Sequence, residues 1–151
     1  MKTVACFSVP ALMTAFCLVS HTALAGEMRS VLHEAAILYD APSIKAKKLY
    51  IVKKFTPLEV LVNLDGMSKV REAEGSVAWV ERSQLSETRT VAVMAAQADI
   101  RQTPDTSAPI LTSAEKWVVL ELLELPINGW ARVKHRDGIS GFVRSSQVWG
   151  I

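Results

Sequence analysis

Cysteine and histidine are scarce in this chain, and their scarcity limits the chemistry that it can perform. The 151 residues include 2 cysteines and 3 histidines. Both cysteines, Cys6 and Cys17, lie in the first 25 residues, which read as an export signal, so the remainder is expected to form no disulfide. Only His33 and His135 remain there, whereas a zinc site needs three or four ligands at close spacing. The sequence therefore predicts no metal site and no cofactor.

Motifs for nucleophilic catalysis and for phosphate binding are missing as well. Ser145 and Ser146 have no nearby histidine and acid, and no Gly-x-Ser-x-Gly turn is present. None of the 7 glycines forms a phosphate-binding loop. The 17 basic and 15 acidic residues nearly balance, which gives no electrostatic case for binding nucleic acid or an anionic membrane. We therefore expect a binding or structural protein, not an enzyme.

The first 25 residues read as a secretory signal peptide. Lys2 supplies the positive start, an apolar run follows, and Ala23 and Ala25 are the small residues that a signal peptidase requires. An uncleaved membrane anchor is the alternative, but polar residues interrupt the run before it reaches the roughly 20 apolar residues of a spanning helix. Phe16 before Cys17 argues against lipidation. We expect cleavage after Ala25, a periplasmic or secreted location, and no membrane contact after cleavage.

The remaining chain contains one module twice. The stretch 65–85, DGMSKVREAEGSVAWVERSQL, matches 128–148, NGWARVKHRDGISGFVRSSQV, at a constant offset of 63, and an offset of 62 relates the residues upstream. An offset that holds over about fifty residues marks a tandem repeat. We expect a signal peptide at 1–25, a first domain at 26–90 and a second domain at 91–151.

Each module is predicted to consist of short β-strands. Residues 68–71 and 131–134 alternate apolar and polar side chains with the period of a half-buried strand. Gly75 and Gly138 mark hairpin turns, where glycine adopts positive φ. Thr90 to Val93 is predicted to close the first module and to run directly into the second, with little freedom between the two.

The segment from Ser113 to Leu125 is the one place where a helix competes with a strand. It is rich in Leu and Glu, yet its counterpart in the first module contains Pro57, which favours a strand. Five short strands in about 60 residues describe a small barrel. The predicted fold class is therefore all-β, with two five-stranded barrels in tandem.

The second module carries the features of a known family. A proline-containing first loop (Ile100 to Pro104) is followed by Asn-Gly-Trp-Ala-Arg-Val at 128–133 and by Asp-Gly-Ile-Ser-Gly-Phe-Val at 137–143. This combination resembles the bacterial SH3 (SH3b) family, and the resemblance implies two SH3-like barrels. It also implies contacts with cell-wall peptide or protein through the loops at one end of each barrel. The first module departs from the pattern, with Met67 in place of the tryptophan and Ala78 in place of the second glycine.

Aromatic residues that match between the modules are expected to serve packing. Trp117 matches Phe55, and both are predicted to be core residues. Trp79 matches Phe142, and such pairs more often pack in a core or hairpin than bind a ligand. Trp130 is expected to pack across the mouth of the second barrel.

Candidate ligand-binding residues lie where the two copies disagree. Tyr39 stands against Arg101, although Tyr39 could instead be a strand-end aromatic. The first module has a lysine cluster within residues 45–54, of which Lys45, Lys47 and Lys48 are the candidate ligand residues. The second module has Asp105, Thr106 and Ser107 in place of this cluster. A solvated loop is the simpler interpretation of that cluster. Trp149 lies outside the common pattern, either exposed or between the modules.

The sequence thus predicts a non-enzymatic, exported binding or adaptor protein. Its expected partner is cell-wall peptidoglycan or a protein or peptide. The alternative is a structural or assembly protein whose rigid tandem barrels serve one dedicated periplasmic protein. The oligomeric state stays open.

Overall fold

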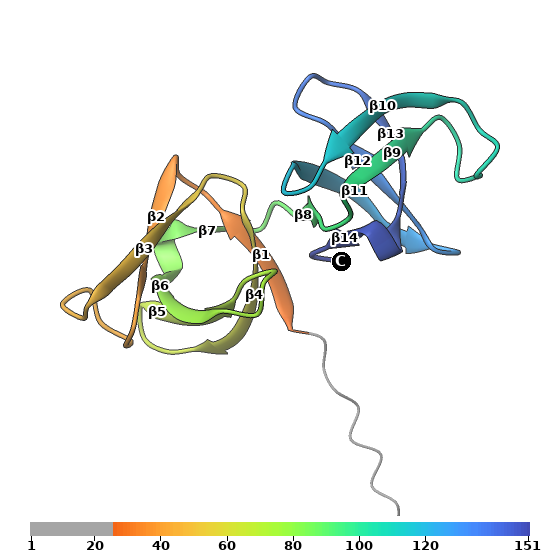
Figure 1. The fold of residues 1–151 in the computed structure, drawn as a ribbon. Helices are drawn as coiled ribbons and strands as arrows, with labels where there is room; N and C mark the ends of the chain where they lie inside the picture. Colours follow the sequence, from red (N-terminus) through yellow and green to blue (C-terminus); the bar gives the residue numbers. More distant parts are fainter. Residues whose placement is uncertain (1–25) are drawn as a thin grey trace, which may run out of the picture.

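The computed structural model describes residues 26–151, so the expected signal peptide and both cysteines lie outside the described residues. Within this range the chain forms two antiparallel sheets joined by a short link (Figure 1). The first sheet contains β1 (Glu27–Val31), β2 (Ala35–Tyr39), β3 (Lys48–Lys53), β4 (Pro57–Asn63), β5 (Met67–Arg71), β6 (Val77–Glu81) and β7 (Leu85–Ser86). The second contains β8 (Thr90–Val93), β9 (Gln97–Arg101), β10 (Ile110–Glu115), β11 (Val119–Ile127), β12 (Trp130–Lys134), β13 (Ser140–Arg144) and β14 (Val148–Trp149).

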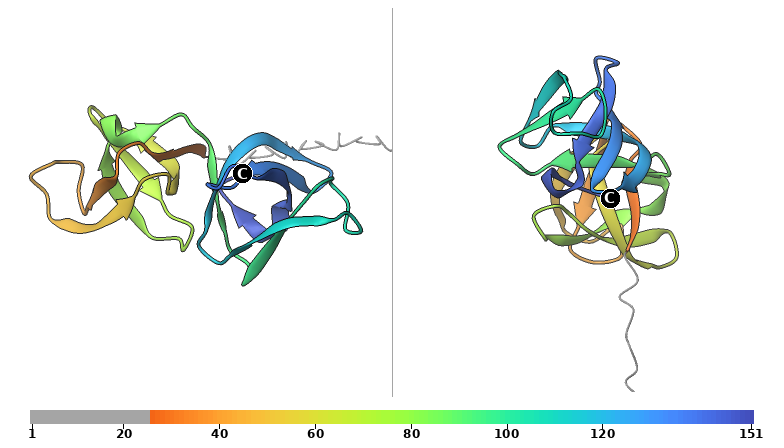
Figure 2. Two further views of the ribbon diagram at one scale, coloured as in Figure 1. Left: turned by 90° about the horizontal axis from the view of Figure 1, so that it is seen from above. Right: turned by 90° about the vertical axis from the view of Figure 1, so that its right-hand side faces the viewer.

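The two sheets have the same topology. Their strand orders are β3-β2-β6-β5-β4-β1-β7 and β10-β9-β13-β12-β11-β8-β14, so each strand of the first sheet has a counterpart in the second. Each sheet curls around its own core, as the two further views show (Figure 2). The all-β fold with two SH3-like modules is confirmed. The expected number of five strands is too low, because each sheet holds seven, including a two-residue final strand.

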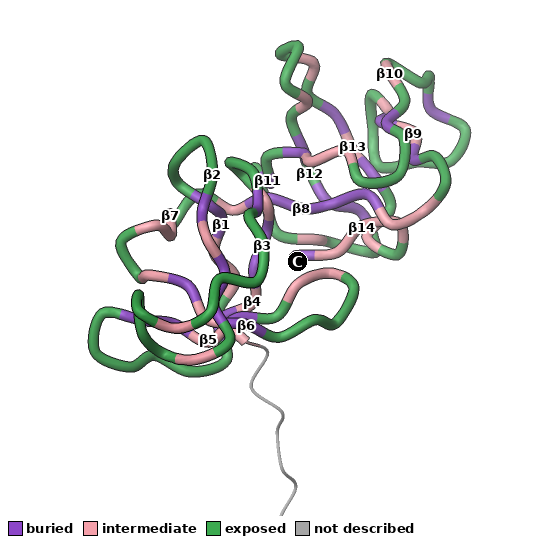
Figure 3. Tube along the Cα trace, turned by 60° about the vertical axis from the view of Figure 1, so that its left-hand side comes forward, coloured by how far each residue is buried: buried purple, intermediate pink, exposed green. Residues whose placement is uncertain are grey.

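The strand from Thr90 to Val93 belongs to the second module. β8 pairs with β11 and with β14, both in the second sheet. The prediction that it closes the first module is therefore wrong, and the two-residue β7, paired with β1, fills that place. The four residues of β8 are all buried (Figure 3). A strand buried along its whole length lacks the alternation that would assign it to one sheet.

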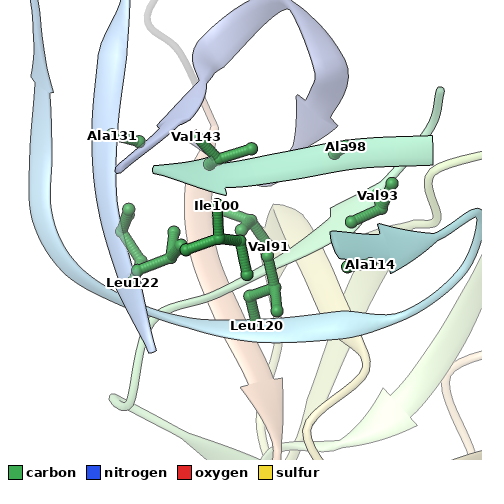
Figure 4. Close-up of a cluster of buried hydrophobic side chains, with 10 residues drawn as sticks. Val91, Val93, Ala98, Ile100, Ala114, Leu120, Leu122, Ala131 and Val143 are labelled. Atoms are coloured by element: carbon green, nitrogen blue, oxygen red, sulfur yellow. The ribbon is translucent and has the colours of Figure 1, made fainter. Parts of the chain in front are cut away.

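Each module has its own hydrophobic core. The side chains of Leu58 in the first core and Leu120 in the second occupy matching positions and are fully buried. Figure 4 shows the second core, where valine, leucine and alanine side chains from several strands converge. These residues are small for a protein core, so each module depends on a modest buried apolar volume.

The local predictions from the turns hold. The backbone N–H of Gly75 donates to the carbonyl of Glu72 (2.8 Å) and that of Gly138 to the carbonyl of His135 (2.9 Å), with φ of 90° and 92° at the two glycines. The 3₁₀ turns η1 (Arg82–Gln84) and η2 (Ser145–Gln147) follow the last long strand of each module. Strands β10 and β11 cover most of 113–125, which confirms strand over helix there.

Direct contacts join the two modules. The Thr90 hydroxyl, buried to 3% exposure, donates to the carbonyl of Phe55 (2.7 Å). Gly150 lies so close that a Cβ on it would stand 2.7 Å from the carbonyl oxygen of Thr90 and 3.2 Å from Cβ of Pro57. The C-terminal residues are therefore packed against both modules.

Candidate functional site

A small groove lies at one end of the second module, where its loops meet. It has a volume of about 230 Å³. It is formed by the β9–β10 loop, the end of β11, the β11–β12 turn, β12 and β13. Its lining consists of Pro104, Glu124, Leu125, Ile127, Asn128, Trp130, Arg132 and Phe142. The groove therefore has an apolar surface with one acidic and one basic side chain at its rim.

The tight turn before β12 places the central tryptophan. Asn128 and Gly129 have φ of 51° and 81°, so both adopt the left-handed conformation of a two-residue hairpin turn. Ile127 and Trp130 are paired across this turn. Ile127 is 68% exposed, whereas Trp130 is buried to 8%. The turn thus presents an exposed isoleucine beside a mostly buried indole.

Charged side chains fix the aromatic surface. The guanidinium carbon of Arg144 lies 4.7 Å from the centroid of the Trp130 ring, a cation–π arrangement worth about 0.5–2 kcal/mol. Arg132 Nη1 lies 2.6 Å from Glu124 Oε1, and both side chains are about half exposed. An exposed ion pair of this kind contributes about 0–1 kcal/mol. These pairs orient the rim more than they stabilise the module.

The β9–β10 loop, which carries Pro104, is held by its own polar contacts. Arg101 donates from Nη1 to the carbonyl of Ala108 (2.7 Å) and from Nη2 to Asp99 Oδ2 (3.2 Å). Asp105 Oδ1 accepts from the backbone N–H of Ser107 (2.7 Å) and from its hydroxyl (2.8 Å). These hydrogen bonds hold the pKa of Asp105 below its ordinary value, and the bond from the Ser107 backbone N–H has the larger effect.

The structure does not bring the predicted ligand residues together. Tyr39 is 3% exposed at the end of β2, so it is a core residue and the prediction of a surface aromatic there is wrong. Its place in the strand next to Trp79 of β6 explains the burial. Arg101 is engaged in holding its loop. The lysines Lys45, Lys47 and Lys48 are exposed around the β2–β3 loop of the first module.

Trp149 is half-buried in β14, where it is paired with Ala92 of β8. It occupies the position that Ser86 has in the first module. Trp79 and Phe142 are half-buried, and Phe142 lines the groove. Phe142 therefore packs within the module, as expected, and also lines the groove.

Sequence reasoning missed two exposed aromatics. Phe55 is 48% exposed and Trp117 is 45% exposed, so the prediction that they are core residues is wrong. Both precede their strands instead of lying in them, since β4 starts at Pro57 and β11 at Val119. Their backbones have φ of 67° and 71°, which turns the side chains outward.

Residues 26–151 contain neither a cluster of metal ligands nor a membrane-spanning helix. No group of three or more His, Cys, Asp or Glu side chains there is arranged to hold a metal ion. In the same residues, no helix has the length and apolar character to cross a membrane.

The fold and the groove define a tandem pair of small SH3-like barrels. A model of the bacterial SH3 domain matches the chain twice, over residues 33–87 and 95–150. The chain therefore belongs to the bacterial SH3 domain family, whose members are binding modules.

Among curated proteins, no relative matches the chain. Two solved structures share a weak likeness with it, described as NlpC1 and NlpC2 from Trichomonas vaginalis. Each is 15% identical, with TM-scores of 0.41 and 0.38, and the matches cover 86% and 82% of this chain. The same matches cover 48% and 47% of those chains, so the chain spans about half their length.

Proposed function

We propose that this chain is a non-enzymatic, exported binding protein whose bacterial SH3 modules contact cell-wall peptidoglycan or a protein or peptide partner. The observation that carries the proposal is the groove of the second module. There, Pro104, Trp130 and Phe142 form an apolar surface with Arg132 and Glu124 at its edge. Apolar surface with a few charged groups is the usual composition of a ligand site.

The groove suits an extended peptide segment better than a compact small molecule. Its volume of about 230 Å³ is below the roughly 300–1,000 Å³ of most small-molecule sites. A flat aromatic and proline surface between loops can instead receive one or two side chains of a longer chain. The periplasm, or the space outside the cell, is where the expected export signal would deliver the protein to such a partner.

Retention on insoluble peptidoglycan tests the proposal. Residues 26–151 are expected to sediment with it, and Phe142→Ala is expected to reduce the bound fraction by removing a side chain of the groove. The matched control is Trp79→Ala, which makes the corresponding change in the first module. The proposed groove would be excluded by two results together. The protein would not sediment with peptidoglycan, and Phe142→Ala would capture the same protein partners as the wild type in cross-linking.

The lysines of the first module provide a second comparison in the same assay. If retention depends on Lys45, Lys47 and Lys48, their replacement by glutamine will release the protein, and added salt will do the same. If neither the glutamine replacements nor added salt reduces retention, the contact belongs to the groove of the second module.

A structural protein with rigid tandem barrels is the second candidate, and the contacts between the modules favour it. The buried Thr90 hydroxyl bonds to Phe55 across the joint, and Gly150 packs between Pro57 and Thr90. Such a protein would bind one dedicated periplasmic protein and would not sediment with peptidoglycan. Cross-linking in cells followed by identification of the captured protein separates the two candidates.

A further inference from the structure

A second and larger groove lies between the two modules. Its volume is about 710 Å³, within the range of roughly 300–1,000 Å³ that is common for ligand sites. Phe55 of the first module and Trp117 of the second both line it. These two residues are equivalent in the repeat, so the joint brings both copies of one aromatic position to the same groove.

The backbone at both aromatic positions is in an unfavourable conformation. The φ angles of 67° and 71° lie in the left-handed region, where a bulky side chain is an outlier. The same hydrogen bond holds each one: Phe55 N–H donates to the carbonyl of Val31 (2.9 Å) and Trp117 N–H to that of Val93 (2.8 Å). Strain of this kind often marks a functional position. Glycine would fit here without strain, and the chain has a large aromatic instead.

Neither ring is buried by its own module. A lysine lies over each, with Lys54 Nζ 5.3 Å from the Phe55 centroid and Lys116 Nζ 4.9 Å from the Trp117 centroid. Both rings remain almost half exposed. A pair of exposed aromatics that line one groove from two modules provides surface for a large apolar side chain.

The charge around the groove is mainly positive. Lys54, Lys134 and Arg136 line it, whereas Glu121 is the acid among its lining residues. Lys54 is paired with Glu34 at 3.1 Å, whereas Lys134 lies across from Glu121 in the β11–β12 register without an ion pair among residues 26–151, and Arg136 has no ion pair there. In the first module Arg71 matches Lys134, but Glu72 matches His135 and Ala73 matches Arg136, so the hairpin of the second module carries more positive charge. A ligand with carboxylates complements these cations.

The link between the modules fixes the floor of the groove. Thr88 and Thr90 both line it, and the Thr90 hydroxyl holds the carbonyl of Phe55 at 2.7 Å. The hydrogen bond therefore positions one aromatic wall directly. Thr88 is exposed and offers a hydroxyl to a peptide backbone.

We propose that this groove binds an acidic segment of a partner protein, with a large apolar side chain between Phe55 and Trp117 and its carboxylates toward Lys134 and Arg136. The inference rests on the proposed binding function and assigns it a second site with its own partner chemistry. The two aromatic rings complement an apolar side chain, and the excess of cations over acids complements carboxylates. A segment that has both meets the requirement.

Fluorescence polarisation with labelled synthetic peptides tests the proposal. The probe is an eight-residue peptide of alternating glutamate and leucine, and its two controls replace every glutamate by glutamine or every leucine by serine. The acidic, apolar peptide is expected to bind residues 26–151 at least about tenfold more tightly than either control. Equal binding of the three peptides, or no binding of any at millimolar protein, would overturn the proposal.

The variants are chosen to leave the fold intact. Trp117→Gly and Phe55→Gly remove the rings and relieve the positive φ, so the thermal midpoint should hold or rise while peptide affinity falls about tenfold. The joint change Lys134→Gln with Arg136→Gln should weaken binding several-fold and reduce its dependence on salt. If both glycine variants have a lower thermal midpoint but bind the peptide with unchanged affinity while folded, the rings have a structural role and the proposal is contradicted.

Ile44→Ala and Lys53→Gln are the matched controls, because both residues are exposed and neither lines a groove of the second module or the groove between the modules. They are expected to leave peptide affinity unchanged. If peptidoglycan retention falls in Phe142→Ala while the peptide binds no variant or wild type, the proposed function survives and this inference fails. If the peptide binds and retention is absent, the inference stands and the cell-wall partner is excluded.

Discussion

The two modules share a backbone framework and differ in the side chains placed on it. In the first, Val31 N–H donates to the carbonyl of Thr56 (3.1 Å); in the second, Val93 N–H donates to that of Val118 (2.9 Å). Similar pairs recur at the hairpins and at the 3₁₀ turns. Duplication has thus preserved the positions that satisfy buried backbone groups, since leaving such groups unpaired is costly.

The modules differ in the side chains around the start of β5 and β12 and in the charged residues next to their aromatics. Met67 of the first module stands where the second has Trp130, and Lys69 stands where the second has Arg132. Lys69 Nζ is 6.0 Å from the Trp79 ring, whereas Arg144 lies closer, at 4.7 Å, to Trp130. The comparison indicates that one scaffold carries two distinct surfaces, so the modules are not expected to bind the same ligand.

The largest expected effect comes from the two cores. Leu58→Ala and Leu120→Ala remove matching, fully buried side chains, and each should lower the free energy of unfolding by about 2–5 kcal/mol. Urea denaturation of residues 26–151 measures the loss. Because the modules contact each other through the joint, we expect one transition that both variants shift. Two separate transitions, each sensitive to one variant, would show that the modules unfold independently.

A smaller effect is expected at the position where the modules differ by a methyl group. Gly141 has Ala78 as its counterpart, and a Cβ on Gly141 would lie 2.5 Å from the carbonyl oxygen of Arg101 and 2.8 Å from Ile100 Cγ2. Gly141→Ala should therefore cost about 1–3 kcal/mol in unfolding free energy. The reverse change in the first module, Ala78→Gly, should cost about 1 kcal/mol or less from backbone entropy. If Gly141→Ala leaves the free energy of unfolding unchanged, β9 and β13 can move apart to accept the methyl group without cost.

The framework could be predicted from the sequence because its signals are local. Gly75 and Gly138 mark turns that need positive φ, and alternation before and after them gives the strands. The constant offset then identifies the second copy of each element. The sequence does not reveal the module to which β8 belongs, because all its residues are buried and no polar face indicates which sheet it joins.

The surfaces could not be predicted because they depend on tertiary contacts and on single backbone angles. Trp117 begins an apolar run, and nothing in its pattern reveals that the strand starts two residues later, after a left-handed turn. The one sequence feature that points to exposure of these aromatics is the lysine that precedes each of them, Lys54 and Lys116. The groove at Trp130 needs the β9–β10 loop to meet the β11–β12 turn, which no local pattern specifies.

The joint offers a test of how far the two modules act as one body. Thr90→Val keeps the shape of the side chain but removes the donor to the carbonyl of Phe55, leaving a partly buried acceptor without its partner. This should cost about 1 kcal/mol and increase cleavage by proteases in the link between β7 and β8. Thr88→Val, at an exposed position in the same link, should cost less than about 0.5 kcal/mol. Equal stability and equal cleavage of the two variants would show that the bond does not couple the modules.

The smallest expected effect is a pH dependence of stability that only the first module has, through Tyr50. The Tyr50 hydroxyl donates to the Glu72 carboxylate, whereas Thr112 and His135 occupy these positions in the second module. Burial first, and then this hydrogen bond, raise the pKa of Tyr50 from 10.0 to about 12. Folding therefore favours the neutral phenol, and its stabilising contribution is complete below pH 10 and is lost as the pH rises through about 12. Phenolate absorbance should show this late titration, and Tyr50→Phe should abolish it. The variant should also reduce the loss of stability over the same interval. A Tyr50 that titrates near 10 would show that Glu72 does not hold the hydroxyl in solution.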